Sequence, residues 1–151
     1  MNTTVTCPTA ADTRSVGRRL ASLLRAGDIV LLAGDLGAGK TVFASGIAEG
    51  LGVDDPVVSP SFVLVRRYTG LMSMIHADLY RLGSSGELED LDLESDAAEG
   101  VLVVEWGDVS EQSFGDDLLM VRFTLDDAGV RTLELQPRGV WTTRPLVEVA
   151  G

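Results

Sequence analysis

The chain has 151 residues, a formal net charge of −11 and 45% hydrophobic residues. This length predicts one domain with a single core, and the apolar fraction excludes a disordered chain. Acidic residues outnumber Lys and Arg by 23 to 12, and Lys40 is the only lysine. This balance argues against unaided binding to a nucleic acid, because such binding rests on basic side chains that neutralise phosphates.

The first predicted element is an amphipathic helix, because apolar residues recur along 16–24 at positions i, i+4, i+7 and i+8. Asp12 or Thr13 is its expected N-cap, and Gly27 is its expected end. Residues 28–33 follow as a predicted strand. Its apolar residues run without alternation, which indicates burial on both faces.

A glycine-rich turn leads from this strand into a second predicted helix, which runs from Lys40 to about Leu51 and ends at Gly52. The acidic stretch 87–99 is predicted to be a solvated short helix or loop. Further strands are predicted over 62–68, 71–77, 101–104, 118–125 and 130–135, and the last two form a hairpin. This order predicts an α/β fold whose mixed parallel and antiparallel sheet is flanked by helices. We expect a single domain over 1–151, with no structure assigned to the tail beyond about residue 137.

Three features indicate the compartment. No apolar run reaches the ~20 residues that a membrane-spanning helix needs. The N-terminus has neither the basic nor the apolar region of a secretory signal. Cys7 is the only cysteine, which excludes an internal disulfide. We therefore expect a cytoplasmic protein.

The strongest motif in the sequence is Gly-Asp-Leu-Gly-Ala-Gly-Lys-Thr at residues 34–41, which matches G-x-x-x-x-G-K-[ST]. Glycines allow the backbone to wrap closely around phosphate oxygens. Lys40 supplies a positive charge to the outer phosphates, and Thr41 offers a hydroxyl to Mg²⁺. The following helix directs its positive N-terminal end at the same anion. The motif lies between a predicted strand and a predicted helix, so it indicates a P-loop that binds ATP and Mg²⁺. The predicted nucleotide contacts in this segment are Asp35, Leu36, Gly37, Ala38, Gly39, Lys40, Thr41 and Val42.

Two acidic residues directly follow apolar strands, namely Asp78 and Glu105. A P-loop site needs an acidic residue at the end of a neighbouring strand, where it holds or orients the water shell of the metal. Periodicity does not choose between the two. Both are therefore candidate catalytic residues, together with Lys40.

Other polar residues are weaker candidates. His76 is the only histidine, and its apolar neighbours favour a half-buried strand residue over a proton carrier. Arg66, Arg67 and Arg81 have the chemistry to stabilise a transferred phosphoryl group, but surface arginines are usually only solvated. Trp106 is either a core residue or a lid over the nucleotide.

Taken in order, these motifs resemble one family, the bacterial ATPase subunit of the tRNA threonylcarbamoyladenosine-modification machinery (the TsaE, or YjeE, family). The match begins with the P-loop and continues through Ser-Pro-Ser-Phe at 59–62. It then includes His-Ala-Asp-Leu-Tyr-Arg at 76–81 and Val-Val-Glu-Trp at 103–106. The Asp-Leu-Tyr-Arg and Glu-Trp elements make the resemblance specific, because the P-loop alone is shared by very many proteins.

The resemblance implies a P-loop NTPase-like fold and a cytoplasmic ATPase that works with two partner proteins. One partner transfers the threonylcarbamoyl group to adenosine 37 of tRNA, and hydrolysis by this subunit cycles the complex. Contact with tRNA would be indirect, and no membrane or DNA partner is expected. By family likeness, Thr41 and Glu105 belong to the metal site and Asp78 supports hydrolysis. Ser61 responds to the γ-phosphate, and Trp106 shapes the same site.

The chain departs from the family pattern at three positions. Ser61 stands where the family usually has threonine, so the hydroxyl is kept and the methyl is lost. Ala77 replaces a frequent aromatic residue, and Val42 replaces a frequent second threonine.

Three alternative functions can be compared with this one. A P-loop kinase for a small molecule generally needs an arginine-bearing lid, and the sequence has no long inserted lid. A GTPase is disfavoured, because guanine recognition usually needs an N-K-x-D motif and Asn2 is the only asparagine. A nucleotide-gated binding module with little turnover stays open as an alternative, because partner-dependent ATPases look idle alone.

Overall fold

The computed structural model describes residues 2–34, 37–57, 65–78, 98–105 and 114–150. The elements are β1 (Thr3–Cys7), α1 (Ala10–Ala21), β2 (Ile29–Gly34), α2 (Lys40–Gly50), β3 (Val65–Tyr68), β4 (Met74–Asp78), β5 (Val101–Glu105), β6 (Leu118–Leu125), β7 (Arg131–Arg138) and two 3₁₀ turns, η2 (Gly139–Thr143) and η3 (Leu146–Glu148). Within these ranges, no helix is long and apolar enough to cross a membrane.

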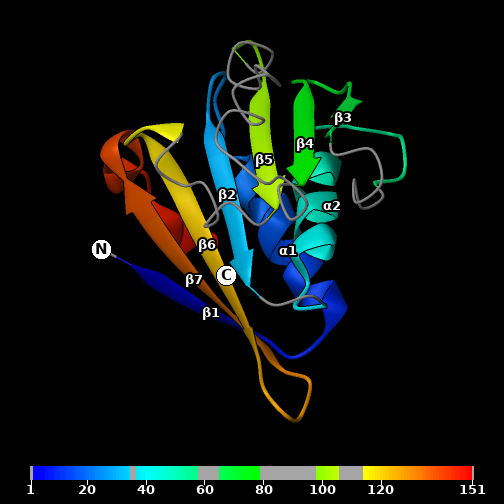
Figure 1. Ribbon diagram of the computed structural model, residues 1–151, viewed down its shortest axis with the longest axis vertical. Coiled ribbons are helices and arrows are strands. Elements are labelled where there is room, and N and C mark those ends of the chain that lie inside the picture. Colours follow the sequence, from blue (N-terminus) through cyan, green and yellow to red (C-terminus); the bar gives the residue numbers. More distant parts are fainter. Residues whose placement is uncertain (1, 35–36, 58–64, 79–97, 106–113, 151) are drawn as a thin grey trace.

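The seven strands of the described residues form one sheet in the order β1-β7-β6-β2-β5-β4-β3 (Figure 1). The central strand β2 runs parallel to both β5 and β6, and β4 runs parallel to β5. The pairs β1–β7, β6–β7 and β3–β4 are antiparallel. The predicted α/β fold with a mixed sheet is therefore confirmed, and β2, the strand before the glycine-rich loop, lies at its centre.

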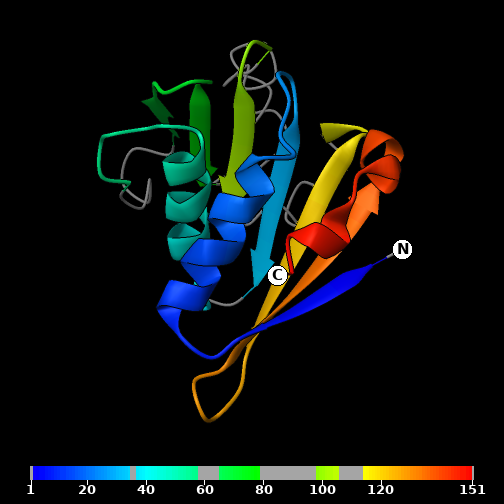
Figure 2. The same ribbon diagram turned by 180° about the vertical axis from the view of Figure 1, so that it is seen from behind.

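Both helices lie on one face of the sheet, and the C-terminal turns lie on the same face beside them (Figure 2). Successive side chains along β2 point to opposite faces of the sheet and so belong to two different parts of the core. Val30 and Leu32 pack in the cluster that contains the helix residues, whereas Ile29 and Leu31 pack in a second cluster on the opposite face. Burial on both faces explains why this strand has no polar positions in its interior.

The two helices approach each other closely because glycines line their contact. A Cβ atom on Gly46 would stand 2.0 Å from the Arg14 carbonyl oxygen, and one on Gly17 would stand 2.3 Å from the Phe43 carbonyl oxygen. Neither distance is compatible with a side chain at these positions. The position of α2 is therefore tied to the position of α1.

The structure corrects the predicted ends of α1. Its N-cap is Thr9, whose hydroxyl accepts a hydrogen bond from the Asp12 backbone N–H, while the Asp12 carboxylate accepts from the Thr9 backbone N–H. This reciprocal capping box makes Asp12 the third helical residue rather than the cap. The helix ends at Ala21 with Ser22 as its C-cap, so Gly27, with a φ of +90°, lies in the following turn.

Several strand predictions also change. Strand β1 was missed, β4 begins at Met74 rather than Leu71, and β7 continues to Arg138. Leu71 is 92% exposed and lies in a turn before β4. The predictions for 62–64, and those for most of 87–99, lie outside the described residues.

The chain beyond residue 137 is ordered against the rest of the sheet. Trp141 is fully buried, and the Arg144 guanidinium lies 4.1 Å from the centre of its ring. Arg144 also donates two hydrogen bonds to the Asp28 carboxylate, over 2.5 and 3.0 Å. Arg19 Nε donates to the Val149 carbonyl oxygen over 2.8 Å. The C-terminal turns therefore hold α1 and the start of β2 together.

Candidate nucleotide and metal site

The glycine-rich loop joins the end of β2 to the start of α2, as the sequence predicts. Gly34 has no space for a side chain, because a Cβ atom there would stand 2.6 Å from the Phe123 carbonyl oxygen. Gly39 is the N-cap of α2 with a φ of +105°, a conformation that favours glycine. Its lack of a capping side chain leaves the first N–H groups of α2 without the usual side-chain acceptor. Such a helix end suits a bound anion.

Lys40 points into this loop. Its side chain is almost entirely buried, and Nζ donates a hydrogen bond to the Gly34 carbonyl oxygen over 2.7 Å. The ammonium group therefore lies beside the loop backbone. This is the position from which a P-loop lysine can reach phosphate oxygens.

Thr41 and Glu105 meet at the start of α2. The Thr41 hydroxyl lies 2.9 Å from Glu105 Oε2 and 3.1 Å from Oε1. Hydroxyl and carboxylate oxygens are ligands that suit Mg²⁺, which usually takes one or two protein ligands and completes its shell with phosphate and water. In the described part of the chain, no group of three or more His, Cys, Asp or Glu side chains is arranged as a metal cage. The Thr41 hydroxyl and the Glu105 carboxylate are oxygen donors that suit a magnesium ion bound together with a nucleotide.

Asp78 lies beside Glu105. The two residues are register partners at the ends of the parallel strands β4 and β5, and both are buried. Their side chains share the face of the sheet on which α2 lies, because register partners in adjacent strands point to the same side. The structure thus places both predicted acidic residues at the C-terminal ends of neighbouring parallel strands.

His76 makes a contact that the sequence analysis missed. Its side chain is fully buried rather than half-buried, and Nε2 lies 2.6 Å from Glu105 Oε2. The available signal was the i, i+2 spacing of His76 and Asp78, which places both on one face of a strand. Arg66 is the register partner of His76 across β3 and β4, and its buried Nε atom has no hydrogen-bond partner among the residues that the structure describes.

The remaining predicted site residues have different outcomes. Val42 is half-buried and lines a groove with residues of α1, among them Ala10 and Arg18. Arg67 is exposed. The residues Asp35, Leu36, Ser61, Arg81 and Trp106 lie outside the described residues.

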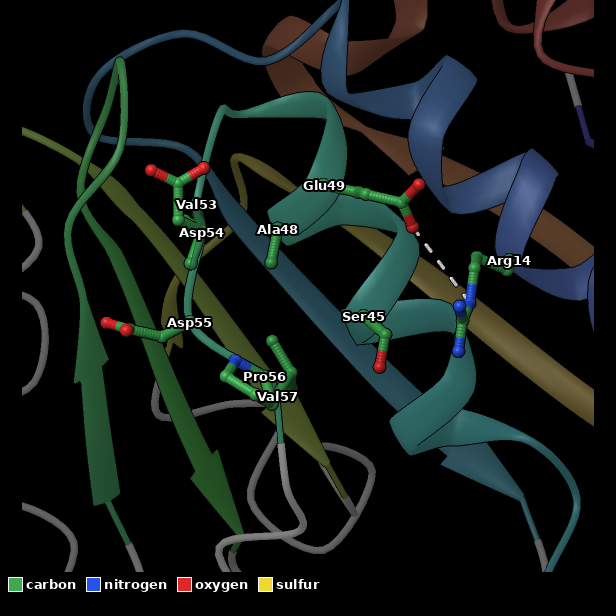
Figure 3. A pocket seen from close by; sticks show the side chains of 9 residues that line it. All are labelled: Arg14, Ser45, Ala48, Glu49, Val53, Asp54, Asp55, Pro56 and Val57. Atoms are coloured by element: carbon green, nitrogen blue, oxygen red, sulfur yellow. Dashed lines mark ion pairs between the residues drawn. The ribbon is translucent and has the colours of Figure 1, made fainter.

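A second groove of about 290 Å³ lies between α2 and residues 53–57 (Figure 3). Arg14 and Glu49 form an ion pair at its rim, with 4.0 Å between Arg14 Nε and Glu49 Oε2. Ser45, one turn beyond Thr41, also lines it. Among the described residues, none of the predicted nucleotide or metal residues lines this groove.

Comparison with known proteins points to one family. The family model described as "Threonylcarbamoyl adenosine biosynthesis protein TsaE" matches residues 7–133. The "tRNA threonylcarbamoyladenosine biosynthesis protein TsaE" of Streptomyces coelicolor is 49% identical over 113 residues, which cover 72% of this chain and 76% of that protein. The protein of the same name from Bacillus subtilis is 38% identical over 112 residues, covering 73% and 70%.

The fold has a similar solved structure, the crystal structure of Bacillus subtilis YdiB. It aligns with a TM-score of 0.82 and 28% sequence identity, over 99% of this chain and 94% of the other. The likeness extends over the C-terminal turns as well as the sheet and helices, since nearly the whole chain is covered. The P-loop NTPase-like fold is thereby confirmed.

Proposed function

This chain belongs to the TsaE family of threonylcarbamoyl adenosine biosynthesis proteins, and from that membership we propose that it is a Mg²⁺-dependent ATPase that supports formation of N6-threonylcarbamoyladenosine at position 37 of tRNA. Family membership supports the role in tRNA modification. The single observation that carries the ATPase proposal is the contact between Thr41 and Glu105 beside a complete phosphate-loop sequence.

The loop and Lys40 bind the phosphates of ATP in this proposal. The Lys40 ammonium exchanges its hydrogen bond to the Gly34 carbonyl for contacts with the outer phosphate oxygens. The backbone N–H groups of the first turn of α2, which follows Gly39, donate further hydrogen bonds to the phosphates. No capping side chain has to move first. Ser61 and Trp106 complete the nucleotide site as predicted contacts.

Thr41 and Glu105 would hold Mg²⁺ through their oxygen atoms. The ion, when bound with ATP, supplies positive charge that offsets the charge developing on the phosphate oxygens. The two side chains are already adjacent, so the protein part of the site needs little ordering on binding.

Hydrolysis proceeds by in-line attack of water on the γ-phosphate. Lys40 and the loop amides stabilise the transition state electrostatically. Asp78 supports this step from its place beside Glu105 at the strand ends. A buried carboxylate that faces the site is suited to orient a water molecule by accepting its hydrogen bond.

In this proposal the ATPase acts in the cytoplasm and cycles a complex with two partner proteins, one of which transfers the threonylcarbamoyl group. The partners provide the contact with tRNA, because the chain carries 23 acidic residues against 12 basic ones.

The test follows the γ-phosphate of labelled ATP, first with this protein alone and then with the two partners and tRNA. We expect slow release of inorganic phosphate alone and faster release with partners. Transfer of the label to a small molecule, with no response to the partners, would favour a kinase. Tight ATP binding without turnover under either condition would favour the nucleotide-gated module.

A further inference from the structure

The contact between His76 and Glu105 has no part in the functions described so far. Nε2 of His76 lies 2.6 Å from Glu105 Oε2, and the two side chains are 0% and 5% exposed. The contact joins β4 to β5, with His76 two residues before Asp78, the register partner of Glu105. His76 therefore reaches Glu105 diagonally across the sheet and on the face that α2 covers.

The hydrogen bond fixes which nitrogen of His76 carries the hydrogen. A carboxylate accepts only, so Nε2 must donate to Glu105 Oε2. The other nitrogen, Nδ1, is buried and has no hydrogen-bond partner in the described part of the structure. Glu105 is therefore the single hydrogen-bond partner of this ring among the described residues.

We propose that His76 is a positioning residue that fixes the Glu105 carboxylate for Mg²⁺, an inference that rests on the proposed ATPase function. Two donors converge on Glu105 Oε2, namely the Thr41 hydroxyl at 2.9 Å and His76 Nε2 at 2.6 Å. The Thr41 oxygen is itself a predicted ligand of the ion. His76 is not a predicted ligand, so its hydrogen bond to Glu105 does not have to break when the ion binds Thr41.

The physical consequence concerns the freedom of the glutamate. Fixing a glutamate side chain carries a conformational entropy cost. If His76 already holds the Glu105 side chain in place, metal binding no longer includes that cost. Residues that orient a metal ligand in this way typically change metal affinity or activity by about 10- to 100-fold when they are removed. His76 binds neither nucleotide nor metal in this proposal and acts through Glu105 alone.

The test measures Mg²⁺ dependence of nucleotide binding rather than turnover. The full chain is titrated with a non-hydrolysable ATP analogue by calorimetry, in EDTA and at increasing Mg²⁺. We expect His76→Leu to raise the half-saturating Mg²⁺ concentration about 10- to 100-fold while analogue affinity in EDTA stays at the wild-type value. His76→Gln keeps a donor near the Nε2 position, and we expect a half-saturating concentration close to that of the wild type.

Two further variants control for folding. Met74→Leu alters a fully buried residue on the same face of β4 and should leave the Mg²⁺ dependence unchanged. His76→Asn keeps a buried amide that is too short to reach Glu105, so it should behave like His76→Leu. If His76→Leu does not fold, the comparison of Asn with Gln decides the matter.

Equal half-saturating concentrations in the Asn and Gln variants, or a wild-type value in His76→Leu, would overturn the positioning role while leaving the ATPase proposal intact. If the wild-type protein itself shows no Mg²⁺-dependent binding of the analogue, the proposed function fails and this inference fails with it.

Discussion

Thr41 and Glu105 are 64 residues apart in the chain, and the hydroxyl of the first lies 2.9 Å from a carboxylate oxygen of the second. The contact forms because β2 and β5 are parallel neighbours, so the helix that leaves β2 passes over the end of β5. It links the first turn of α2 to the neighbouring strand. The relative position of the loop and of the acidic residue is therefore set by the sheet.

The first prediction concerns phosphate binding. Lys40→Ala should weaken ATP binding by about 10- to 100-fold, because hydrogen bonds to charged groups contribute roughly 1.5–3 kcal/mol. The measurement is calorimetric titration with ATP. Arg18→Ala is the matched control, since it removes one positive charge from the exposed side of α1. Unchanged ATP affinity in Lys40→Ala would contradict the assignment of the loop.

The second prediction concerns the two acidic residues at the strand ends. Asp78→Ala and Glu105→Ala should each slow hydrolysis more than they weaken nucleotide binding, with roughly 100-fold loss of kcat for a residue that assists proton transfer or holds the metal. The measurement is phosphate release in the presence of the partner proteins. Asp127→Ala, at the exposed tip of the β6–β7 hairpin, serves as control. Wild-type turnover in both variants would remove these acids from the mechanism.

The third prediction concerns stability. Asp28→Ala leaves the Arg144 guanidinium buried without its carboxylate, since both side chains are 7% exposed. Breaking a buried ion pair on one side costs about 3–5 kcal/mol. Urea unfolding monitored by circular dichroism gives the free energy of unfolding.

The exposed pair of Arg18 and Glu49 provides the comparison for this stability test. Their side chains are 51% and 46% exposed, so Glu49→Ala should cost less than about 1 kcal/mol. Equal losses in Asp28→Ala and Glu49→Ala would show that the C-terminal turns do not depend on the buried pair.

The fourth prediction concerns Cys7. Burial raises the pKa of its thiol above the ordinary value, with the hydrogen bond to Thr13 acting in the opposite direction. Because the thiolate is the reactive form, the folded protein should react with an aromatic disulfide reagent at pH 8 far more slowly than the urea-unfolded protein. Equal reaction rates in the two states would contradict the buried, protonated thiol.

The raised pKa of Cys7 also fixes the sign of a pH effect on stability. The contribution of the protonated thiol is fully present below the pKa of the unfolded chain, and it is lost as pH rises through the higher folded pKa. As pH rises through the alkaline range, the free energy of unfolding should therefore fall less in Cys7→Ala than in the wild type.

Local signals in the sequence were sufficient for the centre of the molecule. The unbroken apolar run of β2 and the apolar face of α2 each occupy a few consecutive residues, and the structure confirms the strand and the helix. The glycine spacing between them predicted a turn from strand to helix, and its role in phosphate binding stays a prediction. Asp78 and Glu105 were each singled out by their place directly after an apolar run, whereas their pairing as neighbours in β4 and β5 comes from the structure alone. The strand and the helix needed no knowledge of distant partners.

The missed features depend on contacts that a local pattern does not contain. Strand β1 buries only Val5 and Cys7 and exists through its pairing with β7. The C-terminal turns rest on Arg144 and Asp28, which are 116 residues apart. The burial of His76 depends on the register of β4 against β5, which places Glu105 within reach.

The close contact of the helices at Gly46 has a consequence for the thermodynamics of nucleotide binding. The Arg14 carbonyl packs directly against Gly46 of α2, and this close contact favours a fixed helix whose first turn is preorganised before any ligand arrives. The loss of configurational entropy on binding is then confined to the loop and to the ligand. Phosphate recognition at this helix end should accordingly show a favourable enthalpy with a small ordering penalty from the protein.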